Sequence, residues 1–313
     1  MQILIIGAGV IGSIIAARLA ASGHQVSVLE KGARLEQLTD SVITIRDGIT
    51  RQVITAPVNV ISDFNILPNY YDYVLVPVQA SQIGDILSKM ADNQGINNVV
   101  IMVNSLQPAQ AYTILKQKML LGFPGMGGGF EGKEVVYRLA NPYLQKTSLG
   151  EINGTVTPRV RTLVKAFAKA GMPAASETNM IAWQQTHISW VIPLAAALYS
   201  AGINNYELAR NPELIKQTIL ATREVMQAIE LTGTPITPGK FKWIKRLPIK
   251  LQIPFWQKAL TDPSIEYLAV RHCRAAVGEI RMLADELADF VGQAGAKADH
   301  FRDLRLSIPF TNK

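Results

Sequence analysis

Three glycines close to the N-terminus have the spacing of a turn that binds a dinucleotide. The G-x-G-x-x-G pattern covers Gly7, Ala8, Gly9, Val10, Ile11 and Gly12. In this pattern the first glycine permits a tight turn, the second lets a pyrophosphate approach the backbone, and the third lets a helix pack closely on a strand. Unpaired N–H groups at the start of that helix attract phosphate oxygens. The pattern predicts that these residues bind NAD or NADP; the alternative is a glycine turn without a ligand.

Two charged residues bear on which dinucleotide is bound. Glu30 and Lys31 follow a strand-like run, at a distance from Gly12 close to the roughly 20 residues typical of such folds. An acid at this position accepts a hydrogen bond from the ribose 2′-hydroxyl of NAD, whereas a base accommodates the 2′-phosphate of NADP. On electrostatics alone the pair is ambiguous, and it could also be a solvated pair at a strand end.

The elements around these residues predict an open parallel sheet. Apolar runs typical of buried parallel strands occupy residues 2–6, 73–78 and 98–103, and residues 24–30 also read as a strand. Residues 41–46 and 52–61 flank Asp47-Gly48, which predicts a hairpin. Ligands bind beyond the carboxyl ends of parallel strands, so Gln79 and Asn104 are candidates for contact with cofactor or substrate. Ordinary loop residues are the alternative for both.

A second glycine-rich stretch, FPGMGGGFEG at residues 123–132, follows another strand-like run. It is expected to be a loop. Its backbone, at Gly128 for example, could lie close to the nicotinamide end of the cofactor, or the stretch could be a flexible surface loop.

Beyond about residue 178 the sequence predicts helices instead of strands. Long helical periods occupy residues 178–201, 211–232 and 263–292. Asn211-Pro212 and Asp262-Pro263 each place a capping residue before a proline at the first helical position. The expected fold class is α/β: a Rossmann-type parallel-sheet domain at residues 1–174, followed by an all-helical substrate or dimerisation domain at residues 175–313.

Composition and cysteine content narrow the class of protein. The chain has 313 residues, of which 48% are hydrophobic and 18% are charged, which suits a folded core. A single cysteine, Cys273, excludes an internal disulfide and a thiolate metal cluster, and no metal is expected. No run reaches the roughly 20 apolar residues of a membrane span, so a cytoplasmic protein is expected.

The net charge of +7 is concentrated in residues 240–258. The bases of this stretch are Lys240, Lys242, Lys245, Arg246, Lys250 and Lys258. Subtracting these six leaves 7 − 6 = +1 for the remaining chain, so the basicity is local and no nucleic-acid partner is expected. The stretch could draw in an anionic substrate, touch a membrane surface or form a solvated loop. Its prolines and spaced aromatics argue against a regular amphipathic helix, so no membrane partner is expected either.

These residues together resemble the ketopantoate reductase (2-dehydropantoate 2-reductase, ApbA/PanE) family over nearly the whole chain. The likeness rests on IIGAGVIGS, LEKGARLEQL, VNSLQ at residues 103–107, NNYEL and the pair Glu279-Ile280. It implies NADPH-dependent reduction of a 2-oxo acid to a 2-hydroxy acid, with Lys31 holding the 2′-phosphate. It also implies that Asn104 lies between nicotinamide and substrate, that Glu279 lies near the nicotinamide, and that Asn205 binds the substrate.

The chain departs from that family on its catalytic helix. Family members carry a lysine there that polarises the keto oxygen and supplies a proton, followed by two asparagines that hold the substrate. These positions fall on Gln185, Ser189 and Pro193 here; a second family lysine falls on Gln79 and a late-helix serine on Tyr267. Glutamine cannot deliver a proton near pH 7, so activity on ketopantoate itself is expected to be impaired.

His187 is the candidate to replace the missing acid, because histidine titrates near neutral pH. Two residues along a helix correspond to a turn of about 200°, so His187 faces away from Gln185 and shares a face with Trp183 and Trp190. It is therefore either a core histidine between aromatic rings or, if the helix is rotated relative to family members, the acid.

The sequence thus predicts an NADP-dependent oxidoreductase that reduces a 2-oxo acid or a related small anionic carbonyl compound. The catalytic candidates are Gln185, His187 and Glu279, and the substrate-binding candidates are Asn104, Gln185, Ser189 and Asn205. Further cofactor-binding candidates are Lys31, Gln79, Asn104, Gly128 and Glu279. NAD is the alternative cofactor because of Glu30. A catalytically impaired NAD(P)-binding regulatory protein is the alternative function, and a homodimer is an assembly that would fit either.

Overall fold

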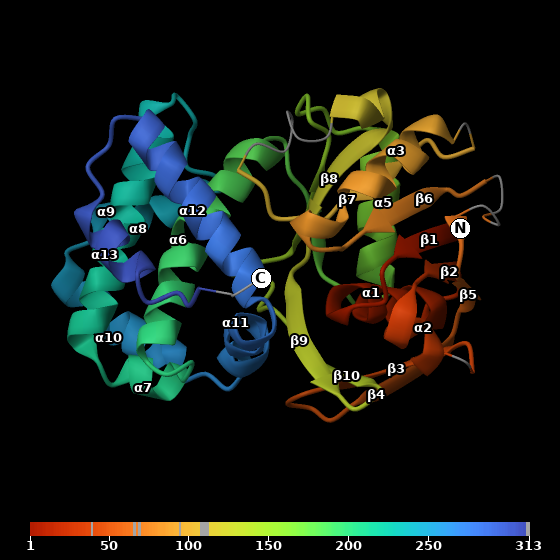
Figure 1. Ribbon diagram of the computed structural model, residues 1–313, viewed down its shortest axis with the longest axis horizontal. Coiled ribbons are helices and arrows are strands. Elements are labelled where there is room, and N and C mark those ends of the chain that lie inside the picture. Colours follow the sequence, from red (N-terminus) through yellow and green to blue (C-terminus); the bar gives the residue numbers. More distant parts are fainter. Residues whose placement is uncertain (39, 65–66, 68–69, 94, 107–112, 311–313) are drawn as a thin grey trace. The chain divides into compact units, whose positions relative to one another are not determined.

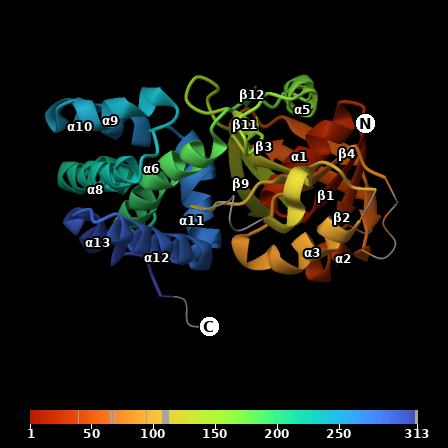
Figure 2. The same ribbon diagram turned by 90° about the horizontal axis from the view of Figure 1, so that it is seen from above.

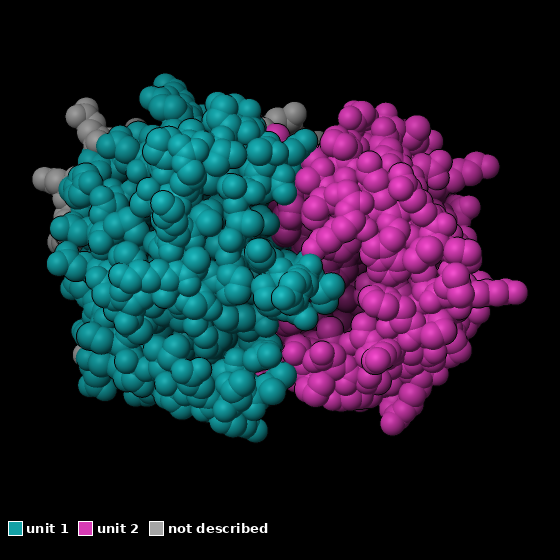
Figure 3. Space-filling view, turned by 180° about the vertical axis from the view of Figure 1, so that it is seen from behind, with its two compact units in different colours: residues 1–103, 107–180 teal, residues 104–106, 181–313 magenta. Residues whose placement is uncertain are grey.

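The chain divides into two compact units in the computed structural model (Figure 1). The structure describes residues 1–313 except 39, 65–66, 68–69, 94, 107–112 and 311–313. Unit 1 comprises residues 1–103 and 107–180, and unit 2 comprises residues 104–106 and 181–313 (Figure 3). The expected boundary after residue 174 lies in an edge strand of unit 1, ahead of the division after residue 180.

An eight-stranded sheet forms the centre of unit 1, in the order β12-β11-β8-β7-β6-β1-β2-β5. Its strands are β1 (Gln2–Ile6), β2 (Gln25–Leu29), β5 (Asn59–Ile61), β6 (Tyr73–Val76), β7 (Val99–Ile101), β8 (Met119–Phe123), β11 (Thr147–Gly150) and β12 (Ala174–Ser176). In this order, every pair of neighbouring strands between β8 and β5 is parallel, whereas β11 is antiparallel to β8. Because β2 and β6 lie on opposite sides of β1, the order reverses there, which is where open sheets of this kind bind ligands.

Burial on both faces explains why these strands read as continuous apolar runs. Ile3, Leu4 and Ile5 of β1 are each 0% exposed, although successive side chains point to opposite faces of the sheet. Helices of unit 1 are α1 (Val10–Ala21), α2 (Gly32–Gln37), α3 (Gly84–Asp92) and α5 (Pro158–Lys169), with short 3-10 turns η2 (Ala80–Gln82) and η3 (Thr113–Lys118).

A second, four-stranded sheet also contacts α1, so this helix is covered by two sheets. Its order is β4-β3-β10-β9, built from β3 (Val42–Asp47), β4 (Val53–Pro57), β9 (Met126–Glu131) and β10 (Glu134–Leu139). The predicted hairpin is confirmed: β3 and β4 are antiparallel, and Asp47 Oδ1 accepts hydrogen bonds from Ile49 N (2.9 Å) and Thr50 N (2.8 Å).

The glycine-rich stretch at 123–132 was wrongly expected to be a loop, since most of it forms β9. Gly128 pairs with Tyr137 of β10, and a Cβ on Gly128 would lie 2.4 Å from Val136 O. The close approach of the neighbouring strand therefore requires a residue without a side chain here. Glycine is generally depleted in strands, which is why the composition favoured a loop. The run 52–61 also differs from expectation, because it divides into β4 of one sheet and β5 of the other.

Unit 2 is helical, which confirms the predicted fold class of a parallel-sheet domain followed by helices. Its α-helices are α6 (Met180–Ser200), α7 (Asn205–Ala209), α8 (Pro212–Leu231), α9 (Trp243–Arg246), α10 (Ile249–Leu260), α11 (Arg271–Ala275), α12 (Val277–Gln293) and α13 (Asp299–Arg305). A 3-10 turn η4 (Gly239–Lys242) and a π-helical segment η5 (Glu266–Val270) complete the described part. Helix α8 contacts α9, α10, α12 and α13 and lies between these two pairs (Figure 2).

One expectation about these helices needs correction. The run 263–292 is not one helix, because Ala276 (φ −124°, ψ 37°) separates α11 from α12. The basic stretch 240–258 is divided into η4, α9 and most of α10, so it does not form one regular helix, in agreement with the sequence. Trp243 stacks on Trp256 at a ring-centroid distance of 6.0 Å, so the aromatics that interrupt the pattern join α9 to α10. The predicted start of α8 is confirmed, since Asn211 Oδ1 accepts from Leu214 N at 3.0 Å.

Candidate functional site

The glycine turn after β1 has the backbone geometry that its sequence pattern predicts. Gly7 has a φ of +94°, a conformation that glycine adopts without strain. A Cβ on Gly12 would lie 1.9 Å from Gly7 O, so α1 passes the turn too closely for a side chain. A Cβ on Gly9 would meet no atom within 4 Å. The fold itself therefore requires Gly7 and Gly12, whereas Gly9 leaves open space over the turn.

The start of α1 has the features of an anion site. Gly9 is the N-cap residue, no side chain caps the helix, and no acid lies in the first turn. Gly9 is exposed, and Val10 and Ile11 are half-buried. The free N–H groups and the positive end of the helix dipole can therefore receive a phosphate.

Glu30 follows β2 and its carboxylate is held by the backbone of the turn. Oε2 accepts a hydrogen bond from Ala8 N at 2.5 Å, and Oε1 accepts one from Lys31 N at 2.8 Å. The Glu30 backbone N–H donates to Ile61 O at 3.0 Å, which fixes the residue at the end of the sheet. Lys31 is the exposed N-cap residue of α2. The structure thus brings Glu30 to the glycine turn, as its spacing predicted.

Arg34, which the sequence pattern did not single out, ties this turn to neighbouring elements. Its guanidinium donates to Ala8 O (3.1 Å), Ser13 Oγ (3.3 Å), Gln37 Oε1 (2.9 Å) and Lys133 O (3.1 Å). It also lies 4.7 Å from the ring centroid of Phe130 in β9. Burial lowers the pKa of Arg34 and the charge of Glu30 opposes that shift. The sequence could have indicated Arg34 as a residue near the glycine turn, because it lies about one helical turn after Lys31.

A short segment after β7 gathers three of the candidate residues within unit 2. The Asn104 side chain forms a hydrogen bond with the carboxyl group of Glu279 on α12. Gln185 Nε2 on α6 donates to Leu106 O at 2.9 Å. Residues 104–106 therefore connect α6 to α12, and they bring together Asn104, Gln185 and Glu279 as candidates for one site. The adjoining Gln107 lies outside the described residues.

Gln185 keeps an unused acceptor in this arrangement. The residue is 6% exposed, and its Oε1 is buried without a hydrogen-bond partner. Its amide can therefore accept a hydrogen bond from a bound group, but it has no proton to give near pH 7.

Glu279 has an environment suited to proton transfer. Because Ala276 breaks the helix, Glu279 lies in the first turn of α12. Burial raises the pKa of this carboxyl, and the hydrogen bond from Asn104 pulls in the opposite direction. A carboxyl group whose pKa is raised keeps its proton at higher pH and can act as a general acid.

His187 lies in an aromatic stack. Its ring is parallel to Trp183 (centroids 5.2 Å apart, 6° between planes) and edge-on to Trp190 (5.2 Å, 78°). Burial, together with the charge of His272, lowers the pKa of His187 to about 3. The ring is therefore neutral at pH 7. The shared face with the two tryptophans is confirmed, and this environment favours a core histidine over a proton donor.

The other candidates make structural contacts. Ser189 Oγ donates to Thr186 O of its own helix at 2.6 Å, and Asn205 Nδ2 donates to Leu260 O at 2.7 Å. Both residues are buried, at 0% and 2% exposure. Gln79 is exposed in the loop after β6. A role of these residues, or of Gly128, in binding stays a prediction.

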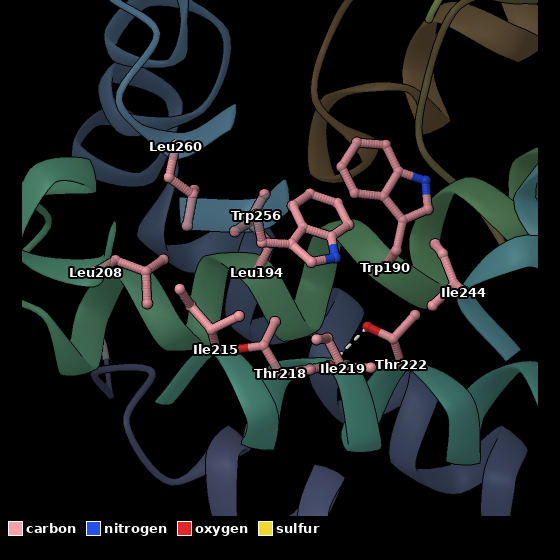
Figure 4. A pocket seen from close by; sticks show the side chains of 10 residues that line it. All are labelled: Trp190, Leu194, Leu208, Ile215, Thr218, Ile219, Thr222, Ile244, Trp256 and Leu260. Atoms are coloured by element: carbon pink, nitrogen blue, oxygen red, sulfur yellow. Dashed lines mark hydrogen bonds between the residues drawn. The ribbon is translucent and has the colours of Figure 1, made fainter. Parts of the chain in front are cut away.

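A pocket inside unit 2 lies among α6, α7, α8, α9 and α10 and is apolar (Figure 4). Its lining comprises Trp190, Leu194, Leu208, Ile215, Thr218, Ile219, Thr222, Ile244, Trp256 and Leu260. The two threonine hydroxyls donate to backbone carbonyls of α8, Thr218 to Leu214 O (2.7 Å) and Thr222 to Thr218 O (2.8 Å). This lining carries no charged side chain that would recognise an anionic substrate.

Two kinds of feature are absent from the residues that the structure describes. No group of three or more His, Cys, Asp or Glu side chains there could hold a metal ion. Likewise, none of the helices in the described part is long and apolar enough to cross a membrane.

Solved structures similar to this chain share its fold over almost their full length. A 2-dehydropantoate 2-reductase from Methylococcus capsulatus is 20% identical, with 98% of this chain and 95% of that chain covered and a TM-score of 0.74. One from Geobacter metallireducens GS-15 is 16% identical, with 98% and 99% covered and a TM-score of 0.78. A ternary structure of D-mandelate dehydrogenase with NADH and anilino(oxo)acetate is 14% identical, with 98% and 97% covered and a TM-score of 0.76.

Sequence comparison finds one family to which part of the chain is similar. No curated protein matches it. Residues 3–154 match the family model described as "Ketopantoate reductase PanE/ApbA". That stretch contains the glycine turn, Glu30, Lys31 and Asn104. Residues 3–154 are thus similar to the ketopantoate reductase PanE/ApbA family, and solved 2-dehydropantoate 2-reductases share the fold of nearly the whole chain.

Proposed function

We propose that this protein is a nicotinamide-dependent oxidoreductase that reduces a 2-oxo acid, or a related small carbonyl compound, to the alcohol. The observation that carries the proposal is the glycine turn, where Gly9 leaves open space beside an uncapped helix start. The names of the similar structures, 2-dehydropantoate 2-reductase and D-mandelate dehydrogenase, support 2-oxo acids as the substrate class. The family resemblance predicts NADPH as the reductant through Lys31, and Glu30 makes NADH the alternative.

The residues around the turn fit such a cofactor. The N–H groups at the start of α1 would bind the pyrophosphate, and the carboxylate of Glu30, which accepts from Ala8 N of the turn, would meet the adenosine ribose. A bound nicotinamide supplies the hydride that reaches the carbonyl carbon. The protein must then place the carbonyl and deliver a proton to its oxygen.

Within unit 2, Glu279 is the best-suited group to deliver that proton. The resemblance predicts a lysine for this role at position 185, but the chain has Gln185 there, and the burial of His187 leaves its ring neutral. The Glu279 carboxyl has a raised pKa and is oriented by Asn104. We therefore assign Glu279 as the general acid, Asn104 as the group that orients it, and Gln185 as a hydrogen-bonding partner of the substrate.

A substitution of Glu279 tests this assignment. Glu279→Gln keeps an oxygen that can accept from Asn104 but removes the proton, so kcat should fall by about 10²–10⁴-fold. The wild-type rate should decline as the pH rises through the raised pKa of Glu279, because the acid form is lost, and the variant should lack this decline. Glu286→Gln, two turns further along α12 and also with a pKa raised by burial, is the matched control. Equal loss in both variants, or an unchanged pH profile, would exclude Glu279 as the acid.

A non-catalytic, nucleotide-binding protein on the same fold is the second candidate. Gln185, in place of the family lysine, favours it. This candidate predicts that the nucleotide binds but that a broad panel of 2-oxo acids gives no oxidation of NADH or NADPH. Turnover of any panel member, measured by the absorbance of the reduced nicotinamide, would reject it.

A further inference from the structure

The carboxylate of Glu30 is oriented before any nucleotide binds. Ala8 N and Lys31 N each donate to a different oxygen of this carboxylate, at 2.5 Å and 2.8 Å. Each oxygen of an ionised carboxylate can accept about two hydrogen bonds, so both oxygens keep an acceptor site. A donor that arrives over the glycine turn therefore meets fixed acceptors, and little freedom of the side chain is lost on binding.

The two neighbouring basic residues, Arg34 and Lys31, do not offset the preference of the Glu30 carboxylate for a hydrogen-bond donor. The Arg34 guanidinium is committed to acceptors on the turn, on α1, on α2 and at Lys133, so it cannot turn to a ligand without breaking these bonds. The side chain of Lys31 belongs to an exposed residue, where water and salt screen its charge. Glu30, in contrast, is half-buried at the turn itself.

We infer that Glu30 selects a nucleotide with a free ribose 2′-hydroxyl, so that the protein uses NADH in preference to NADPH. This inference rests on the proposed function, because it assumes that a nicotinamide nucleotide occupies the glycine turn. The hydroxyl of NADH can donate to the carboxylate. The 2′-phosphate of NADPH carries close to two negative charges and would be placed against it instead. Lys31 then serves as an exposed neighbour of the site and not as its selecting group.

Calorimetric titration of the full chain with NADH and NADPH tests the inference without requiring a substrate. The wild type should bind NADH about 100-fold more tightly than NADPH. Glu30→Gln keeps an acceptor for Ala8 N but removes the charge, so the preference should shrink to about tenfold or less. Glu36→Gln removes the same charge from an exposed position on the same helix as Arg34 and should leave the preference unchanged.

The outcomes separate this inference from the proposed function. Equal or tighter binding of NADPH by the wild type, or an unchanged preference in a folded Glu30→Gln protein, overturns the role of Glu30 while nicotinamide dependence stands. If the wild type binds neither nucleotide, the proposed function fails and this inference fails with it. Thermal unfolding of each variant shows whether it is folded.

Discussion

Replacing Gln185 by lysine tests whether position 185 faces the reacting carbonyl. Gln185 donates to Leu106 O at 2.9 Å and is 6% exposed. A lysine can keep that hydrogen bond, but its ammonium group loses most of its hydration. We expect Gln185→Lys to lower the free energy of unfolding by about 1–3 kcal/mol, because the retained hydrogen bond offsets only part of the cost of burying a charge. The same burial lowers the pKa of the new lysine and makes it a stronger acid.

The expected effect on activity is a gain. If the substrate carbonyl lies at position 185, the added ammonium group should stabilise the negative charge that develops on the carbonyl oxygen, a role separate from proton delivery by Glu279. It should raise kcat/KM on a responsive 2-oxo acid by about 10²–10³-fold. The assay is the oxidation of reduced nicotinamide across a panel of 2-oxo acids, at several pH values. Gln184→Lys is the matched control, since Gln184 is 1% exposed but points about 100° away around the helix.

Two results would refute this reasoning. One is a Gln185→Lys protein that unfolds cooperatively and binds the nucleotide, yet has the wild-type kcat/KM. The other is an equal gain in Gln184→Lys, which would show that any added lysine in this helix suffices. Either result would show that the reacting carbonyl does not lie next to position 185 of α6.

Two further predictions concern the turn and the aromatic stack. Gly12→Ala should lower the free energy of unfolding by about 1–3 kcal/mol or more in denaturant titrations, because its Cβ would lie 1.9 Å from Gly7 O. The Cβ of Gly9→Ala would meet no atom within 4 Å, so this variant should keep its stability within about 1 kcal/mol but bind the nucleotide at least about tenfold more weakly. Nucleotide binding by Gly9→Ala as tight as that of the wild type would contradict close approach of a ligand to the turn. The pKa of His187 is lowered to about 3, so the neutral ring stabilises the fold fully above pH 6.5, and this contribution falls as the pH drops towards 3. The free energy of unfolding of His187→Phe should therefore depend less on pH below 6.5 than that of the wild type, by up to about 1.4 kcal/mol per pH unit. Thermal unfolding of both proteins at a series of acidic pH values measures this difference, and parallel curves of Tm against pH would disprove the low pKa of His187.

The parts of the fold that local sequence determines were predictable. The strand, glycine turn and helix of residues 2–21 need only an apolar run, three glycines and a helical period, and all three appear in the structure. The start of α8 at Asn211-Pro212 is equally local. The second sheet was not predictable, because β3 pairs with β10 far along the chain and β9 contains three consecutive glycines that no propensity scale assigns to a strand.

In the candidate site, too, local features were predictable from the sequence and contacts between distant residues were not. Glu30 was placed correctly by its spacing, but the Arg34 contacts to Ala8 and Lys133 depend on how α2 packs, which spacing does not reveal. The hydrogen bond between Asn104 and Glu279 joins residues far apart in sequence. Its geometry depends on the break at Ala276, whose residue type favours a continuous helix, and the only nearby signal is Gly278, two residues further on.

The assignment of residues 104–106 to unit 2 has a consequence for any attempt to exchange modules among relatives. The helical half is not encoded by one continuous stretch. Residues 104–106, after β7, belong to it, residues 107–180 belong to unit 1, and the rest of the helical half begins at residue 181. A transplanted gene fragment that begins at residue 181 would lack Leu106, which belongs to the hydrophobic core of the helices and accepts the hydrogen bond of Gln185. Recombination at that junction would thus transfer an incomplete half, and chimaeric proteins should carry residues 104–106 and α6 from the same parent.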